Sequence, residues 1–218
     1  MNKTLPRILL TGFDPFDGET VNPSWEAVRA LHGRRVGGHL VVARQLPTEF
    51  AASLRLLKTA MRELRPAIVL GVGQAGGRSQ LSLERVAINL QDARIPDNAG
   101  AQPIDEPVIP GAPAAYFSTL PLKSMLEALH DAGLPAEISH TAGTYVCNHI
   151  AYAMLHLTGK MRGVRAGFIH IPYLPEQAAT LRGAASMAQA EVERALLIAL
   201  YTAATTRVDG KLTGGSLA

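Results

Sequence analysis

The amino-acid sequence predicts an α/β fold, a single-domain α/β/α sandwich with helices on both faces of a mixed, largely parallel sheet. Short apolar runs typical of buried strands alternate with longer segments of helical periodicity. The 218 residues are 47% hydrophobic and 18% charged, which suits one domain with a substantial core. No linker, repeat or low-complexity segment divides the chain. We therefore expect one domain over residues 1–218, with a loose tail over about 209–218.

The N-terminal third alternates strand and helix twice. Residues 7–12 form a short apolar run, and Asn22-Pro23-Ser24 then provides signals for the start of a helix. Residues 40–43 predict a second strand. Thr48 is a suitable N-cap for the long helix that apolar residues at helical spacing predict after it. The unbroken apolar run over 67–73 is typical of a strand inside a parallel sheet.

The remainder of the chain continues this alternation, with one long interruption. Residues 81–90 have the pattern of a strand, whereas residues 91–114 are rich in Pro, Gly, Asp and Asn. A loop of that length inside a compact domain is more often functional than incidental. The other predicted elements are a helix over 122–130, a strand over 136–139, a helix at the single cysteine, a strand over 165–171 and a helix from about Glu176 to Ala203.

Composition and charge exclude several classes of function. The formal net charge is only +3, and the basic residues are scattered without the interleaved aromatic residues of a strand-binding groove, so we expect no nucleic-acid partner. No apolar stretch approaches the roughly 20 residues that a membrane-spanning helix needs. The apolar run over 8–10 is too short for a signal peptide. These features predict a cytoplasmic protein without a membrane partner.

Cys147 is the only cysteine, which excludes an intramolecular disulfide and a multi-cysteine metal site. Small and polar residues precede it, and an apolar helical pattern follows. A thiol in the first turn of a helix lies at the positive end of the backbone dipole, which favours the thiolate. The alternative is a small buried core residue, which position alone favours. A histidine and a carboxylate near this thiol would reverse that preference.

His170 and Glu84 are the candidates for those two groups. His170 ends an apolar strand, where it serves either as a base at the carboxyl edge of the sheet or as a core histidine bonded to backbone. With period two, Glu84 shares a strand face with Val86, Ile88 and Leu90. A carboxylate on an apolar face is costly unless it is paired. Its partner would be an imidazolium or an arginine.

Two loops have the composition of a ligand-binding wall. The glycine-rich loop over 71–78 lacks the Lys-Ser/Thr ending of a phosphate-binding loop, so we interpret it as a place of close approach where Gln74 offers an amide to a ligand. Phe13 and Phe16 flank Pro15 after the first strand. They either cap the core or form the walls of a small apolar pocket.

Five stretches, taken in order, closely resemble the pyroglutamyl peptidase I family, also called pyrrolidone-carboxylate peptidases, which are cysteine peptidases. They are residues 11–16 with 22–25, 73–78 continuing into 83–89, 92–98, 139–148 and 167–172. The stretches span nearly the whole chain, so the resemblance implies a single catalytic domain over residues 1–218.

The resemblance implies a catalytic triad and a reaction. Cys147 matches the family nucleophile, His170 its base and Glu84 the residue that orients the base. The implied reaction removes N-terminal pyroglutamate (5-oxoproline) from peptides through a thioester acyl-enzyme. The family is cytoplasmic, uses no cofactor or metal, and is often a homotetramer.

The resemblance also implies a substrate pocket. Phe13 and Phe16 match the aromatic residues that sandwich the lactam ring, and Arg94 matches an arginine near the oxyanion. Asp17 is a departure, because the family usually has glycine there, and we expect a changed loop with activity retained. Two alternatives stay open: a thiol amidase or acyltransferase acting on another small acyl group, and a binding module without catalysis. The other matching pocket positions are Thr48, Gln74, Ile95, Tyr145 and Val146.

Overall fold

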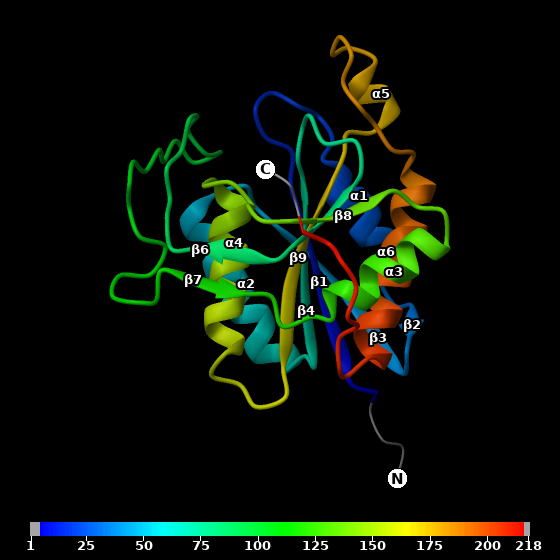
Figure 1. Cartoon of the computed structure of the whole chain (residues 1–218). Coiled ribbons are helices and arrows are strands. Elements are labelled where there is room, and N and C mark those ends of the chain that lie inside the picture. The colour runs from blue at the N-terminus through cyan, green and yellow to red at the C-terminus, as the bar shows by residue number, and fades with distance from the viewer. Residues whose placement is uncertain (1–4, 216–218) are drawn as a thin grey trace.

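The computed structural model describes residues 5–215 and has the predicted α/β/α architecture (Figure 1). Its main sheet has seven strands within the described residues. In spatial order these are β2 (Arg35–Val36), β3 (His39–Leu46), β1 (Arg7–Phe13), β4 (Ile68–Gln74), β9 (Arg165–Ile171), β5 (Leu81–Glu84) and β8 (Ala136–Ser139).

The sheet is mixed but largely parallel, as the sequence predicts. Strand β1 pairs in parallel with β3 and β4, and β4 pairs in parallel with β9. Strand β5 is antiparallel to β9 and parallel to β8, while β2 forms an antiparallel edge on β3. The direction therefore reverses once inside the sheet, between β9 and β5.

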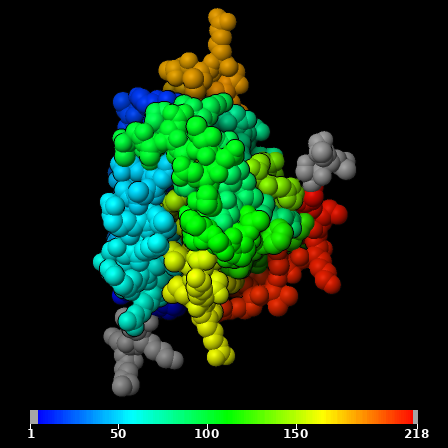
Figure 2. All heavy atoms as spheres, turned by 90° about the vertical axis from the view of Figure 1, so that its left-hand side faces the viewer, coloured from blue at the N-terminus to red at the C-terminus, as the bar shows by residue number. Residues whose placement is uncertain are grey.

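Helices cover both faces of the sheet. Strands and helices α1 (Pro23–Ala30), α3 (Leu122–Asp131) and α6 (Gln189–Thr205) enclose one apolar core. On the other face lie α2 (Phe50–Leu64) and α4 (Val146–Thr158) with a two-stranded ribbon. The ribbon consists of β6 (Val86–Ile88) and β7 (Ala115–Phe117), and the segment between its strands, in green, forms much of this face in Figure 2. The short helix α5 (Pro175–Ala178) projects beyond both layers.

The predicted strand over 81–90 is broken at Arg85. Its backbone N–H donates to Ser139 O, and its carbonyl accepts from Ser118 N, at 2.8 Å each. The chain therefore changes partners at this residue: β5 stays in the main sheet, whereas β6 pairs with β7. The expected face shared by Glu84, Val86 and later residues does not exist, although Glu84 is buried.

The predicted helix from Glu176 to Ala203 is also wrong. Helix α5 has four residues, and α6 begins only at Gln189. Gly183 lies between them with φ of +71°, a left-handed conformation that ends helical geometry. Leu181, which lies between the two helices, is 38% exposed.

Helix α2 begins one residue later than predicted. Its N-cap is Glu49 and not Thr48, and Glu49 makes no side-chain cap bond. Asp97 Oδ2 from the long loop accepts from Phe50 N at 2.9 Å and satisfies one of the free N–H groups of the first turn. The loop is thereby tied to the helix that it covers.

The C-terminal segment was predicted to be loose, and its described part has no regular secondary structure. It nevertheless packs on α3, because the Asp209 carboxylate accepts from Lys123 N and Ser124 N at 3.1 and 2.9 Å. Residues 216–218 lie outside the described part of the chain. Within residues 5–215, no helix is both long and apolar enough to cross a membrane.

Candidate active site

A cavity of about 290 Å³ lies where β1, β4 and β9 end and α4 begins. Sites of α/β sheets gather at the carboxyl ends of their strands. The cavity brings together most of the predicted site residues from five separate segments of the chain. It is lined by Phe13, Phe16, Asn22, Thr48, Gln74, Ala75, Gly76, Arg78, Ala142, Gly143, Tyr145, Cys147 and His170.

Cys147 is the second residue of α4, so the thiol lies in the first turn of a helix as predicted. Its Sγ lies against Gly73, where an added Cβ would come within 2.7 Å of the sulfur. Gly73 is in turn the register partner of His170 on the neighbouring strand. The glycine therefore makes room for the sulfur beside the strand that carries the imidazole. No hydrogen bond joins Sγ to His170 among the described residues, and such bonds are often long without substrate.

His170 and Glu84 form a buried pair. Both residues are 3% exposed, and His170 Nδ1 lies 2.7 Å from Glu84 Oε1. Glu84 is opposite Phe168 in the antiparallel β5–β9 pair, so His170, two residues further along, is its diagonal neighbour on the same face. Arg78 Nη1 donates to the same oxygen at 2.8 Å. Both partners considered for Glu84, a histidine and an arginine, are therefore present.

The electrostatics favour a neutral thiol beside a neutral imidazole. Burial raises the pKa of Cys147 to about 12; the charge of Glu84 also raises it, and Arg78 opposes the rise. The dipole of a helix N-terminus is worth about 0.3–1 kcal/mol, or less than one pKa unit, and does not offset this rise. Burial likewise lowers the pKa of His170 below 6.5, against the opposing influence of Glu84.

The predicted pocket residues divide into three groups. Phe13, Phe16, Thr48, Gln74 and Tyr145 line the cavity of the thiol. Arg94 and Ile95 instead line a second cavity of about 500 Å³, which adjoins the first. Val146 is fully buried in the core between the sheet and α4, so only its backbone is available to a ligand.

Hydrogen bonds from the long loop hold the aromatic walls in place. Tyr145 Oη donates to Pro96 O at 3.0 Å, and Asn98 Nδ2 donates to Pro15 O at 2.9 Å. Thr48 N donates to Asp14 Oδ1 at 2.6 Å, which fixes the loop before Phe16. The segment over 91–114 thus supports both sides of the pocket.

Sequence reasoning gave no role to two residues that organise the site. Arg78 binds Glu84 and also donates through Nη2 to Thr141 O at 2.9 Å, which connects the glycine-rich loop to the loop before α4. Asn148 is fully buried; its side chain accepts from Ile88 N at 3.0 Å and donates to Ile88 O and Leu90 O at 2.9 Å. A polar residue directly after the cysteine was the available signal for Asn148. No such signal existed for Arg78, because the glycine-rich stretch that it ends does not indicate that Glu84 is its partner.

Within residues 5–215, no group of three or more His, Cys, Asp and Glu residues has the arrangement of a metal site. A thiol, an imidazole and a carboxyl group meet at one edge of an α/β/α sandwich, which is the arrangement of a thiol hydrolase. The comparisons with known proteins give the family.

The pyroglutamyl peptidase family model matches residues 6–206. The pyrrolidone-carboxylate peptidases of Klebsiella pneumoniae and Cupriavidus necator are each 56% identical, with 96% of this chain and 98% of the relative covered. The crystal structure of pyroglutamyl peptidase I from Bacillus amyloliquefaciens has a TM-score of 0.93 and 48% identity over 96% of this chain and 100% of that one. The chain belongs to the pyroglutamyl peptidase I family, which are cysteine-type exopeptidases.

A buried histidine beside the site generates a prediction about stability. His149 is 4% exposed, packs edge-on against Phe50, and has no hydrogen-bond partner on either ring nitrogen among the described residues. Burial lowers its pKa to about 4. Between pH 6.5 and 4 the unfolded chain therefore binds more protons, and stability falls as the pH falls.

We expect His149→Leu to remove part of this loss, up to about 3 kcal/mol at the acid end, because leucine has no proton to bind. Urea unfolding of both proteins at pH 7, 5.5 and 4.5 measures the effect. His140→Gln, a change at an exposed histidine, serves as the control. An equal acid loss in wild type and His149→Leu would contradict the prediction.

Proposed function

We propose that this protein removes N-terminal pyroglutamate from peptides, with Cys147 as nucleophile, His170 as general base and Glu84 as the group that orients the base. The main support is the buried Glu84–His170 pair on the wall of the cavity that holds the thiol. A carboxyl group bonded to one ring nitrogen leaves the other nitrogen of a neutral imidazole as an acceptor for the thiol proton.

The cavity suits a small neutral ring. Two phenylalanines and Tyr145 provide apolar walls, and Gln74 Oε1 is buried without a partner among the described residues, so it can accept from a lactam or amide N–H. Arg78 is the one permanently charged residue in the lining, which contains no carboxylate. An ordinary protonated N-terminus would find no counter-charge there, which disfavours unmodified peptides.

The reaction starts from the neutral pair. As Sγ of Cys147 attacks the pyroglutamyl carbonyl carbon, Nε2 of His170 takes the thiol proton, and Glu84 stabilises the imidazolium that forms. His170 then gives this proton to the leaving amine, the C–N bond breaks and a thioester remains. Water, deprotonated by His170, attacks the thioester, and the C–S bond breaks to release pyroglutamate and restore the thiol.

The start of α4 supplies the donors for the oxyanion. The N-cap residue Tyr145 makes no side-chain cap bond, and within the described part of the chain no acceptor is found for the N–H groups of Val146 and Cys147. Such free N–H groups at a helix start favour an anion. Arg94 lies in the adjoining cavity, so we assign the oxyanion to the backbone groups.

The resemblance to the family carries two further proposals. We propose that the protein works in the cytoplasm and assembles as a homo-oligomer, a tetramer by this resemblance. We propose no nucleic-acid or membrane partner, because the charge is small and scattered. The rival activity, a thiol amidase or acyltransferase for another small acyl group, uses the same residues and differs in the ring that the cavity accepts.

Fluorophore release from pyroglutamyl, prolyl and alanyl 7-amino-4-methylcoumarin amides tests the assignment. We expect the wild type to cleave only the pyroglutamyl amide. Cys147→Ala and Cys147→Ser should each lower kcat/KM by about 1,000-fold or more, because Cys147 is the only cysteine of the chain and a hydroxyl is a much weaker nucleophile than a thiol. Thermal unfolding confirms that the variants fold. A Cys147→Ala protein with most of its activity, or equal cleavage of the alanyl amide, would refute the proposal.

The pH profile tests the role of Arg78. Its positive charge lowers the pKa of His170, so Arg78→Met should raise that pKa. The acid limb of kcat/KM reports the free base, and we expect it to move to higher pH in this variant. Arg78→Lys keeps the charge and should move the limb less. A limb that stays in place or moves to lower pH in Arg78→Met would show that Arg78 does not act on His170.

A further inference from the structure

Asp17 occupies the tip of a tight turn that follows the first strand. Glu19 N donates to Phe16 O at 3.1 Å, and φ is +54° at Asp17 and +77° at Gly18. Positive φ at both central residues is the pattern of a type I′ turn, for which Asp-Gly is a preferred pair. Aspartate therefore fits this backbone without unusual strain, and its exposed side chain directly follows a wall of the thiol cavity.

The second cavity, of about 500 Å³, adjoins the cavity of the thiol. It shares Phe16, Gln74, Gly76, Gly143 and Tyr145 with the cavity of the thiol. With the pyroglutamyl ring in the first cavity and its carbonyl carbon at the sulfur, the next residue of the peptide lies across this shared wall. The unpartnered, buried Oε1 of Gln74 belongs to the shared wall and offers an acceptor to the substrate at the junction.

The charges around the second cavity are unbalanced. Asp17, Glu19 and Asp92 line it against a single cation, Arg94, and none of the four forms an ion pair within 4 Å in residues 5–215. The net charge of the lining is therefore −2. Burial raises the pKa of Tyr145, on the shared wall, to about 12, and the charges of Asp97 and Asp17 contribute to this rise.

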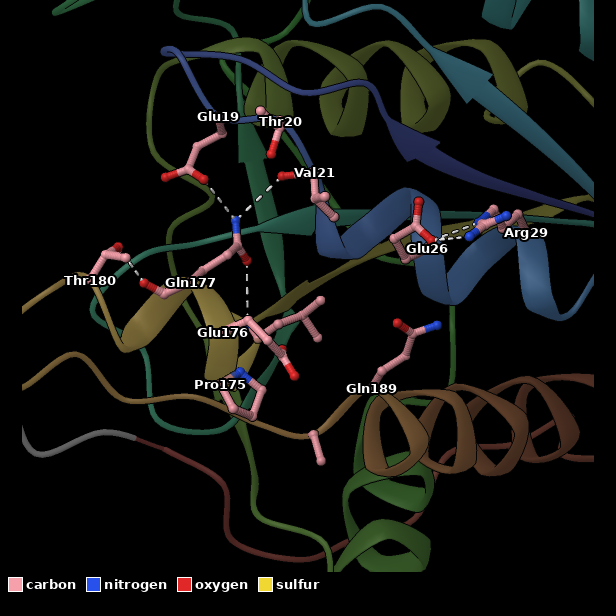
Figure 3. Close-up of a pocket in the computed structure, with 12 residues that line it drawn as sticks. Glu19, Thr20, Val21, Glu26, Arg29, Pro175, Glu176, Gln177, Thr180 and Gln189 are labelled. Atoms are coloured by element: carbon pink, nitrogen blue, oxygen red, sulfur yellow. Dashed lines mark hydrogen bonds and ion pairs between the residues drawn. The ribbon is translucent and has the colours of Figure 1, made fainter.

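Glu19 has a defined position in this arrangement. Gln177 Nε2 of α5 donates to Glu19 Oε2 at 3.4 Å and to Val21 O at 3.3 Å (Figure 3). Glu19 also lines a third cavity of about 750 Å³ between α1 and α5. Glu19 thus lines both the second and the third cavity.

We propose that the second cavity binds the residue that follows pyroglutamate and favours lysine or arginine there, with Asp17 as a determinant of this specificity. The inference rests on the proposed function and adds the class of peptide. Because Asp17 and Asp92 are exposed and Glu19 is only half-buried, solvent screens their charges, and we expect a modest effect, about fivefold in kcat/KM for lysine over glutamate at low salt.

Three amidated tripeptides that differ only in the second residue test this proposal: pyroglutamyl-lysyl-alaninamide, its Nε-acetyl-lysyl analogue and the glutamyl analogue. Release of pyroglutamate is measured at 20 mM and 500 mM NaCl. For the wild type we expect lysyl above acetyl-lysyl above glutamyl at low salt, with ratios near one at high salt. Acetylation removes the charge while keeping most of the side chain, so it isolates the electrostatic part.

Asp17→Asn removes the charge and keeps a residue that tolerates positive φ. We expect it to lower the lysyl-to-glutamyl ratio by about half or more. Asp131→Asn, an equal change of charge at an exposed residue of α3, should leave the ratio unchanged. The ratio cancels any general loss of turnover. This inference alone would be overturned if the lysyl-to-glutamyl ratio of the wild type is one or less, or if Asp17→Asn keeps the ratio of the wild type. Failure of the wild type to cleave any pyroglutamyl substrate would overturn the proposed function as well.

Discussion

The site depends on one buried oxygen, Glu84 Oε1, which lies 2.7 Å from Nδ1 of His170 and accepts from Arg78 at 2.8 Å. A carboxyl group removed from water is costly unless donors replace the lost solvent; here two donors bind Oε1, whereas Oε2 is buried without a partner among the described residues. The mixed sheet brings one of these donors, His170, to the carboxyl group. Because β5 runs antiparallel to β9, Glu84 becomes the diagonal neighbour of His170. The chain leaves the sheet at Arg85, immediately after the carboxyl group has reached its partners.

Burial of the site also determines when charged groups form during the reaction. Burial raises the pKa of Cys147, a half-buried residue on the cavity wall, and lowers that of the more deeply buried His170, so a thiolate–imidazolium pair is disfavoured in the free protein. In the proposed mechanism the charges form only as the sulfur attacks, when Glu84 faces the new imidazolium and the first turn of α4 faces the oxyanion. Gly73 makes this proximity possible, because the Cβ of any other residue there would lie only 2.7 Å from the sulfur.

Apolar periodicity and helix-start signals in the sequence correctly predicted the strands and helices that depend mainly on neighbouring residues. The apolar run over 67–73 is a central strand, and Cys147 does lie in the first turn of its helix. The patterns did not reveal contacts between distant segments. Glu84 and His170 are 86 residues apart, and the strand face used to argue for Glu84 ends at Arg85. The resemblance implies that Arg94 lies near the oxyanion, and this stays a prediction; Arg94 lines the cavity that adjoins that of the thiol.

The tautomer of His170 is the most decisive property for this mechanism. Long-range ¹H–¹⁵N correlation spectra of the histidine-labelled protein at pH 7, with the His170 signals assigned by their loss in a His170→Gln variant, distinguish the three states of the ring. The account predicts a neutral ring that is protonated on Nδ1, donates to Glu84 and leaves Nε2 free to accept the thiol proton. An imidazolium at pH 7, or a neutral ring protonated on Nε2, would contradict it.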